Sequence, residues 1–247
     1  MSLTAQDLTL KGRLNGASLE LRAGEVTAIC GPNGAGKSSL VAALAGLLPL
    51  DAGAVTLDGA DLHTLPLTQR AQAIGYLPQQ GEIAWDVSVE TLVALGRLPW
   101  SAGREEDRAA VEAAIAAMDL TALRTRPVTQ LSGGERARAL LARVLAGTPR
   151  WVLADEPLAN LDLAHQQALL VRFRALAGQG IGVVLVLHDL AQAINQADRV
   201  VVLDAGRIAA DGVPEAALDS ATITRVWKTE TRWLGVPGQR ALVIEQA

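Results

Sequence analysis

The stretch GPNGAGKSS, residues 31–39, has the spacing of a phosphate-binding loop. It follows the apolar run EVTAIC, which is typical of a strand, and it opens a helical pattern. Glycines let backbone N–H groups wrap a phosphate, Lys37 can reach the β- and γ-phosphate oxygens, and the Ser38 hydroxyl suits Mg²⁺. We therefore predict a site for ATP and Mg²⁺. Its residues are Gly31, Pro32, Asn33, Gly34, Ala35, Gly36, Lys37, Ser38 and Ser39.

Two adjacent carboxylates, Asp155 and Glu156, follow the apolar run WVLA. That run is typical of a buried strand, and Pro157 cannot continue a strand ladder. Because successive strand residues point to opposite faces, the two carboxylates are expected to have different tasks. Asp155 suits the Mg²⁺ shell and Glu156 suits polarising an attacking water. The pair thus indicates hydrolysis in addition to binding.

A second glycine pair lies in QLSGGERARALLARVL, residues 130–145. Ser132 and Glu135 have the spacing of a capping box at a helix N-terminus. Glycine in a first helical turn costs up to ~1 kcal/mol relative to alanine, so capping alone does not explain Gly133 and Gly134. Close approach of a ligand to the backbone does. Since no lysine and no carboxylate pair follow, this loop is half of a site.

These three motifs, in this order, resemble those of the ATP-binding cassette (ABC) ATPases, and the resemblance covers nearly the whole chain. LSGGE, residues 131–135, is similar to the family's signature motif. The resemblance implies an α/β fold: a P-loop NTPase core with a mostly parallel sheet, an antiparallel β subdomain and a helical insert. It also implies that two copies meet head to tail. Ser132, Gly133 and Gly134 would then contact the ATP that the other copy's phosphate loop holds.

Three further residues match family motifs. Gln79 in YLPQQ resembles the Q-loop glutamine near Mg²⁺ and the water, His188 in LVLHD resembles the switch histidine, and Asp162 in LANLD resembles the D-loop aspartate that couples the two sites. The implied catalytic residues are Lys37, Gln79, Glu156 and His188, and the implied Mg²⁺ ligands are Ser38, Gln79 and Asp155. We interpret the other two histidines, His63 and His165, as ordinary polar side chains.

The elements that must position these residues follow from hydrophobic periodicity. We expect one domain, residues 1–247, with a helical subdomain at about 84–146 and a C-terminal tail at about 220–247. From residue 150 the pattern alternates strand, helix, strand and strand, as in a mostly parallel sheet covered by helices. The other expected elements are two strands within Ala17–Cys30, a helix at Gly36–Leu47, a strand pair at Ala54–Leu57 and Ala73–Leu77, helices within Val87–Leu123, a short helix at Ile223–Trp227 and a hairpin through Arg232–Glu245.

Composition agrees with a globular domain. The chain has 247 residues, 50% of them hydrophobic, and a net charge of −4, which argues against a general nucleic-acid binder. Its single cysteine, Cys30, is expected to be a buried apolar residue. The longest strongly apolar run, Ile181–Leu187, is far shorter than the ~20 residues of a membrane helix. Any membrane role would need a partner, and we expect a peripheral protein on the cytoplasmic side of the bacterial inner membrane.

Looser resemblances concern the branch of the family. Residues 86–100, ANLDLAHQ and ITRVWKTETRW are similar to cassettes of bacterial importers for iron-siderophore complexes, haem and cobalamin. That branch implies polytopic permease subunits, docked near residues 79–100, and indirectly a periplasmic or surface solute-binding protein. Trp85 and Trp100 would be groove residues or core residues. The alternative is a soluble ABC ATPase of iron–sulfur assembly or repair, which usually has tandem cassettes or long coiled-coil inserts.

Overall fold

A six-stranded, mostly parallel sheet forms the centre of the molecule. The computed structural model describes residues 1–79 and 86–245. The sheet has the order β10-β9-β3-β8-β7-β6, and all neighbours are parallel except β10 at the edge. Its strands are β3 (Val26–Cys30), β6 (Ile74–Leu77), β7 (Trp151–Ala154), β8 (Gly182–Val186), β9 (Arg199–Asp204) and β10 (Arg207–Gly212). The predicted α/β class with a mostly parallel sheet is confirmed.

The central strands are apolar along their whole length because both faces of the sheet are covered. Every residue of β3, β7 and β8 is buried. Alternate residues divide between two cores: Val152 and Ala154 of β7 belong to one, Trp151 and Leu153 to the other. The first core includes residues of α6 (Leu163–Gly178) and α7 (Leu190–Gln196), and the second includes residues of α1 (Lys37–Leu44).

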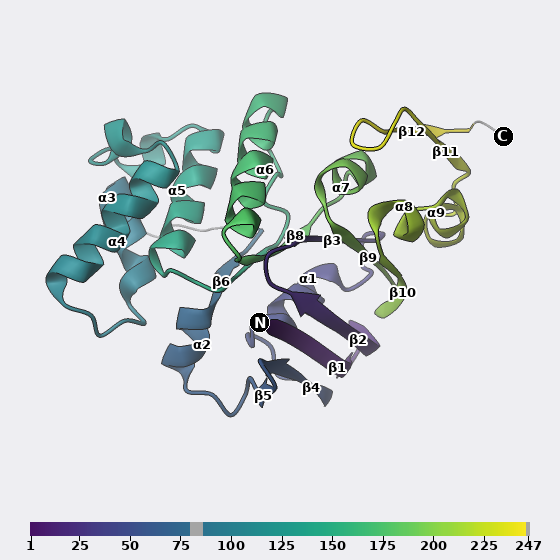
Figure 1. The fold of residues 1–247 in the computed structure, drawn as a ribbon, viewed down its shortest axis with the longest axis horizontal. Coiled ribbons are helices and arrows are strands. Elements are labelled where there is room, and N and C mark those ends of the chain that lie inside the picture. The colour runs from purple at the N-terminus through teal and green to yellow at the C-terminus, as the bar shows by residue number, and fades with distance from the viewer. Residues whose placement is uncertain (80–85, 246–247) are drawn as a thin grey trace.

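A second, antiparallel sheet covers α1 with the order β2-β1-β4-β5 (Figure 1). Its strands are β1 (Ser2–Leu10), β2 (Leu14–Arg22), β4 (Ala52–Leu57) and β5 (Ala60–Asp61). The two strands predicted within Ala17–Cys30 are confirmed as β2 and β3. The predicted pairing of Ala54–Leu57 with Ala73–Leu77 is wrong, since β4 and β6 lie in different sheets. Hydrophobic alternation indicates that a segment is a strand but does not determine its partner.

The helical subdomain, here α3 (Val89–Ala94), α4 (Arg104–Ala117) and α5 (Gly133–Ala146), lies to one side of the sheet (Figure 1). Three short 3₁₀ helices, Leu95–Arg97, Thr121–Leu123 and Val128–Gln130, join its parts. Amphipathic stripes bury Val93, Ile115 and Leu141 against one another and against the first core. The helices predicted within Val87–Leu123 are thereby confirmed.

The C-terminal tail packs beyond the other edge of the sheet (Figure 1). The predicted short helix and hairpin are confirmed as α9 (Ser220–Trp227) and the antiparallel pair β11 (Thr231–Leu234) and β12 (Ala241–Ile244). The remaining helices are α2 (Leu67–Ala73) and α8 (Pro214–Ala217). Within the described residues, no helix has both the length and the apolarity needed to cross a bilayer.

A buried arginine ties the helical subdomain together. Arg97 has 6% of its side chain exposed, and its Nε lies 2.7 Å from Oδ1 of Asp107 on α4. It also donates to the carbonyl of Ala146 at the end of α5, at 3.1 Å, and stacks on the Trp100 ring at 4.7 Å. The Arg97 guanidinium therefore joins α4, the end of α5 and the segment at Trp100.

We predict that Arg97→Met lowers the free energy of unfolding by about 2 kcal/mol, because it removes charge-assisted hydrogen bonds and leaves two acceptors without their donor. Arg108→Met is the matched control, since Arg108 is exposed and lies 3.9 Å from Glu112; its effect should stay within about 0.5 kcal/mol. Urea unfolding followed by circular dichroism measures both. Equal effects of the two variants would show that Arg97 has no special role.

Candidate functional site

Four neighbouring parallel strands end at the same edge of the sheet and deliver the predicted site residues there. The register pairs Ile29 with Val186, Leu185 with Ala154, and Ala154 with Leu77, so β3, β8, β7 and β6 stop at one level. The segments that follow carry, in spatial order, the phosphate loop, His188, the two carboxylates and Gln79. Ligands of open α/β sheets bind at this carboxyl edge.

The phosphate loop passes from β3 into the N-terminus of α1. A Cβ on Gly31 would lie 2.1 Å from the Leu203 carbonyl oxygen, and one on Gly36 would lie 2.3 Å from that of Arg13. Packing against neighbouring backbone therefore requires both glycines. Gly34 faces open space with a φ of +79°, so its backbone stays accessible. The loop thus turns bare amide groups toward solvent at a helix N-terminus, where an anion is stabilised.

Lys37 is buried beneath this loop. Its Nζ donates to the carbonyl oxygens of Gly31 and Pro32, at 2.9 Å each. Burial lowers the pKa of Lys37 from its usual value, with the charges of Glu156, Cys30 and Asp155 acting in the opposite direction. Cys30 is fully buried, and desolvation raises the pKa of its thiol to about 12, so it is inert as the sequence predicted. Phosphate oxygens could replace the two loop carbonyls as acceptors of the Lys37 ammonium.

Asp155 and Ser38 meet across the strand between them. The Ser38 hydroxyl donates to Oδ1 of Asp155 at 3.2 Å, and only 3% of Asp155 is exposed. Burial raises the pKa of Asp155, although the Ser38 hydrogen bond opposes the shift. Hard oxygen donors of this kind fit Mg²⁺, which takes one or two protein ligands and completes its shell with phosphate and water. The described residues contain no cluster of three His, Cys, Asp or Glu that could hold a metal.

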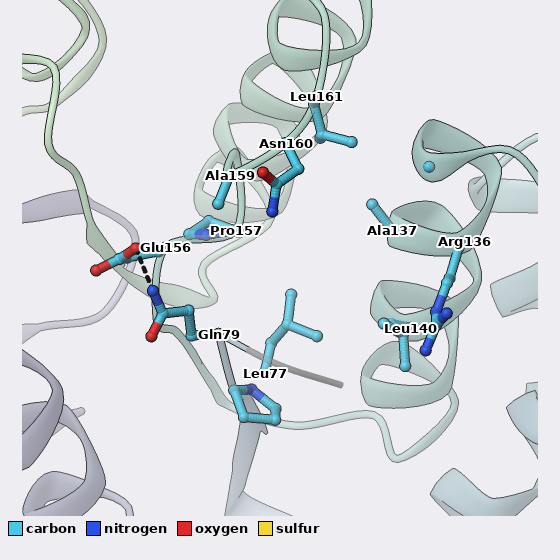
Figure 2. Close-up of a pocket in the computed structure, with 12 residues that line it drawn as sticks. Leu77, Gln79, Arg136, Ala137, Leu140, Glu156, Pro157, Ala159, Asn160 and Leu161 are labelled. Carbon is cyan, nitrogen blue, oxygen red and sulfur yellow. Dashed lines mark hydrogen bonds between the residues drawn. The ribbon is translucent and has the colours of Figure 1, made fainter. Parts of the chain in front are cut away.

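Glu156 points away from Asp155 toward the other predicted catalytic residues. The Gln79 amide nitrogen donates to its Oε2 at 2.6 Å (Figure 2), and Nε2 of His188 lies 2.5 Å from its Oε1. The two carboxylates do have different surroundings, but strand alternation is not the reason. Strand β7 ends at Ala154, and Glu156 turns away with a φ of +50°, a conformation that a non-glycine residue seldom adopts.

The signature loop forms the capped start of α5. Ser132 and Glu135 make both hydrogen bonds of the predicted capping box, which confirms it. Ser132 and Gly133 are exposed, and a Cβ on Gly133 would meet only the Asn160 carbonyl oxygen, at 3.7 Å. Gly134 is different: a Cβ there would lie 2.1 Å from the ring of His165. Packing within the chain explains Gly134, and only Gly133 has the open backbone that we expected of both.

The D-loop aspartate caps the next helix. Asp162 accepts the backbone N–H of His165 at 2.9 Å and lies 2.8 Å from its Nδ1. Chiefly the backbone hydrogen bond lowers the pKa of Asp162. The described contacts of Asp162 are thus local to the start of α6. Sequence reasoning missed the role of His165, although an Asp three residues before a His at a helix start is a capping signal.

A hollow of about 370 Å³ lies between the hydrolytic residues and the signature helix α5 (Figure 2). Gln79 and Glu156 line one side, and Gly133 and Arg136 of α5 line the other. The backbone that leads into α6 closes a third side. The hollow is therefore bordered by the hydrolytic residues and by the signature helix of one chain.

The predicted docking stretch, residues 79–100, is described in part. Trp85 lies outside the described residues. Trp100 is half-buried and donates from its indole nitrogen to the Gly147 carbonyl at 3.1 Å, so it has a packing role in the helical subdomain. Leu98 beside it is 78% exposed.

Comparison with known proteins identifies the group to which this arrangement belongs. The family model described as "ABC transporter" matches residues 14–159, from β2 to the loop after Glu156. The chain belongs to this family. Its members bind and hydrolyse ATP, and the chain is accordingly an ABC ATPase; the matched range includes the Lys37 loop and the Asp155–Glu156 pair.

Curated relatives extend the similarity over most of the chain. It is 44% identical over 216 residues to the hemin import ATP-binding protein HmuV of Rhodococcus jostii, covering 87% of this chain and 74% of that protein. HmuV of Nocardia farcinica is 46% identical over 227 residues, or 91% of this chain and 78% of the relative.

Solved structures agree in fold. An inward-facing ABC transporter described as of metal-chelate type superposes with a TM-score of 0.85 at 25% identity, covering 99% of this chain and 97% of that one. CbiO1 of Clostridium perfringens, part of the ABC transporter complex cbiONQ, gives 0.80 at 26% identity, with 90% and 92% covered. The match to both includes the helical subdomain and supports the predicted ABC ATPase fold.

We predict that Glu156→Gln and Lys37→Ala affect different steps. The side-chain contacts of Glu156 are with Gln79 and His188, so its amide variant should keep Mg-ATP affinity within about threefold and lower hydrolysis about a hundredfold or more. Lys37→Ala removes the buried ammonium and should weaken ATP binding itself. Equilibrium binding and phosphate release measure the two steps. A Glu156→Gln variant with near wild-type hydrolysis would contradict the assignment.

Proposed function

We propose that the chain is the ATPase subunit of a bacterial importer for haem or a related iron chelate, with cobalamin as the next candidate. The similarity to hemin import ATP-binding proteins along most of the chain carries this proposal. The metal-chelate type of the similar transporter structure supports it. The subunit would work as a homodimer beneath a polytopic permease at the cytoplasmic face of the inner membrane, and a solute-binding protein would deliver the solute from outside.

ATP would be shared between two chains. The phosphate loop and Lys37 of one copy hold the triphosphate, and Ser132 and Gly133 of the partner copy close over the γ-phosphate. Two features support this arrangement. Ser132 and Gly133 are exposed at a helix N-terminus, which favours an anion. The nearest neighbours of Gly133 and Gly134 in their own chain are Asn160 and His165, not the phosphate loop.

The chemistry assigned to the chain is in-line transfer of the γ-phosphoryl group to water. Glu156 orients the water and takes its proton as the new oxygen–phosphorus bond forms and the bond to ADP breaks. Gln79 and His188 hold the Glu156 carboxylate, and the half-exposed His188 side chain would also contact the γ-phosphate. Ser38, Asp155 and Gln79 would hold Mg²⁺, which neutralises the charge that develops on the phosphate oxygens.

The alternative function is a soluble ABC ATPase of iron–sulfur assembly or repair. No feature of the described residues favours it over the importer. The chain holds one cassette motif set, and its insert is the compact three-helix unit α3–α5.

The permease would dock on the helical subdomain. A groove of about 450 Å³ lies beside α3 and α4, lined by Glu90, Arg97, Leu98 and Trp100 among others. Of these, Leu98 is an exposed apolar side chain. Charged side chains beneath an apolar rim suit a short amphipathic helix of a membrane subunit.

We predict that Gly133→Asp abolishes shared-site hydrolysis without unfolding α5. An Asp suits the first turn of a helix, whereas its carboxylate would repel the partner's γ-phosphate, so hydrolysis should fall at least about tenfold. ATP binding by the single chain should be unchanged. Gly103→Asp is the control, because Gly103 caps α4 and has open space around it. Loss of ATP binding by the Gly133→Asp monomer would contradict the shared site.

We also predict that Leu98→Cys, labelled with a photoactivated crosslinker, joins the chain to a polytopic protein in membranes of the source bacterium. Leu234→Cys on the exposed tail hairpin is the control and should not crosslink to that protein. Crosslinks from Leu234 alone would place the docking surface on the tail. Recovery of the chain in the cytosol with no crosslink from either site would favour the soluble alternative.

A further inference from the structure

His165 lies between two motifs that are thirty residues apart in sequence. One edge of its imidazole faces Asp162, where Nδ1 and Oδ1 are 2.8 Å apart. The opposite edge lies over Gly134: a Cβ built there would be 2.1 Å from Cδ2 and 2.6 Å from Nε2. The ring therefore fills the space above the bare Cα of the signature helix while the D-loop carboxylate holds its other side.

We infer that His165 is a positioning residue, which sets the signature helix of its own chain at the distance and angle needed to close the partner's ATP site. The inference rests on the proposed sharing of ATP between Ser132 and Gly133 of one copy and the phosphate loop of the other. His165 does not touch the nucleotide in this account. It acts through the backbone of Gly134, one residue from Gly133.

Stability alone does not account for the arrangement. The side chains of Asp162 and His165 are 65% and 40% exposed, and exposed pairs of this kind contribute little to folding. The backbone N–H of His165 already satisfies the cap at Asp162, at 2.9 Å. The side-chain bond adds a fixed direction for the ring, and the ring in turn occupies the space directly over the Cα of Gly134.

Hydrogen bonds of the neighbouring residue fix the first turn of α6 in place. Gln166, the next residue, donates to the Leu158 and Leu161 carbonyls at 3.3 and 3.0 Å and accepts from Gln192 of α7 at 2.8 Å. The loop from Glu156 to Asp162 is thus held to the first turn of α6. Because the His165 imidazole lies over Gly134, it sets the position of α5 relative to α6.

The first test compares two substitutions of His165 in the full chain. His165→Leu fills the space but cannot donate to Asp162, and it should lower kcat for ATP about tenfold or more, because small displacements of a closing group have large kinetic effects. His165→Asn can place an amide nitrogen where Nδ1 lies but leaves the space over Gly134 unfilled, so it should lower kcat as well. Single-chain ATP binding should be unchanged in both. His63→Leu, on an exposed loop, is the control.

Unchanged kcat in either His165→Leu or His165→Asn would overturn the inference. Ser132→Ala in the same assay distinguishes failure of the shared ATP site from failure of the role assigned to His165. If Ser132→Ala hydrolyses ATP normally, the shared site itself is wrong. If Ser132→Ala is impaired and His165→Leu is not, only the role of His165 is wrong.

Mixed dimers then show in which of the two chains His165 acts, and they remain informative if His165→Leu is less stable. Chains with Lys37→Ala, added in excess, lack a working phosphate loop but still offer Ser132 to the minority chains. His165→Leu placed in the excess chains should lower hydrolysis about tenfold, whereas His165→Leu in the minority chains should change it less than about twofold. Equal losses in both arrangements would show a general structural effect and overturn the inference.

A double-mutant cycle with Gly134→Ala tests the contact directly. A methyl group at Gly134 must displace the ring, so Gly134→Ala should impair hydrolysis when His165 is present and add no further loss in His165→Asn, whose side chain is shorter. Strictly multiplicative losses would mean that Gly134 and His165 act independently, and the inference would fail.

Discussion

The level at which four parallel strands end is the constraint on which the site depends. Because β3, β8, β7 and β6 are in register, side chains from segments more than a hundred residues apart meet without any long loop having to fold over them. Ser38 reaches Asp155 across β8, and Gln79 and His188 reach Glu156 from the strands on either side of β7. A shift of one residue in a strand would move its side chains from one core to the other and separate these pairs.

Local motifs could be predicted from the sequence because their function is local. The phosphate loop needs its glycines, Lys37 and Ser38 within nine residues, and the capping box of Ser132 and Glu135 spans one helical turn. Strands β3, β7 and β8 could also be predicted because their apolar runs reflect burial on both faces, and β2 because its polar and apolar residues alternate. Strand β1 and helix α7 were missed: β1 lies between β2 and β4 but mixes polar and apolar residues without strict alternation, and α7 has only seven residues.

Contacts between distant segments could not be predicted. Nothing near Gly134 in the sequence indicates that the ring of His165 lies over it, and nothing in Ala54–Leu57 indicates that β4 pairs with β1 rather than β6. The direction of Glu156 was predicted correctly for a reason that does not apply, because its backbone leaves the strand with a positive φ. Each of these features depends on tertiary packing that periodicity does not encode.

The central claim is that one chain carries two phosphate-binding elements because each serves a different ATP. A structure of the Glu156→Gln variant with ATP and Mg²⁺ tests this most directly, since slow hydrolysis should retain the nucleotide. The account predicts a dimer with two ATP molecules, each between Lys37 of one chain and Ser132 and Gly133 of the other. An ATP-bound form in which Ser132 contacts the γ-phosphate held by its own chain, or contacts none, would contradict it.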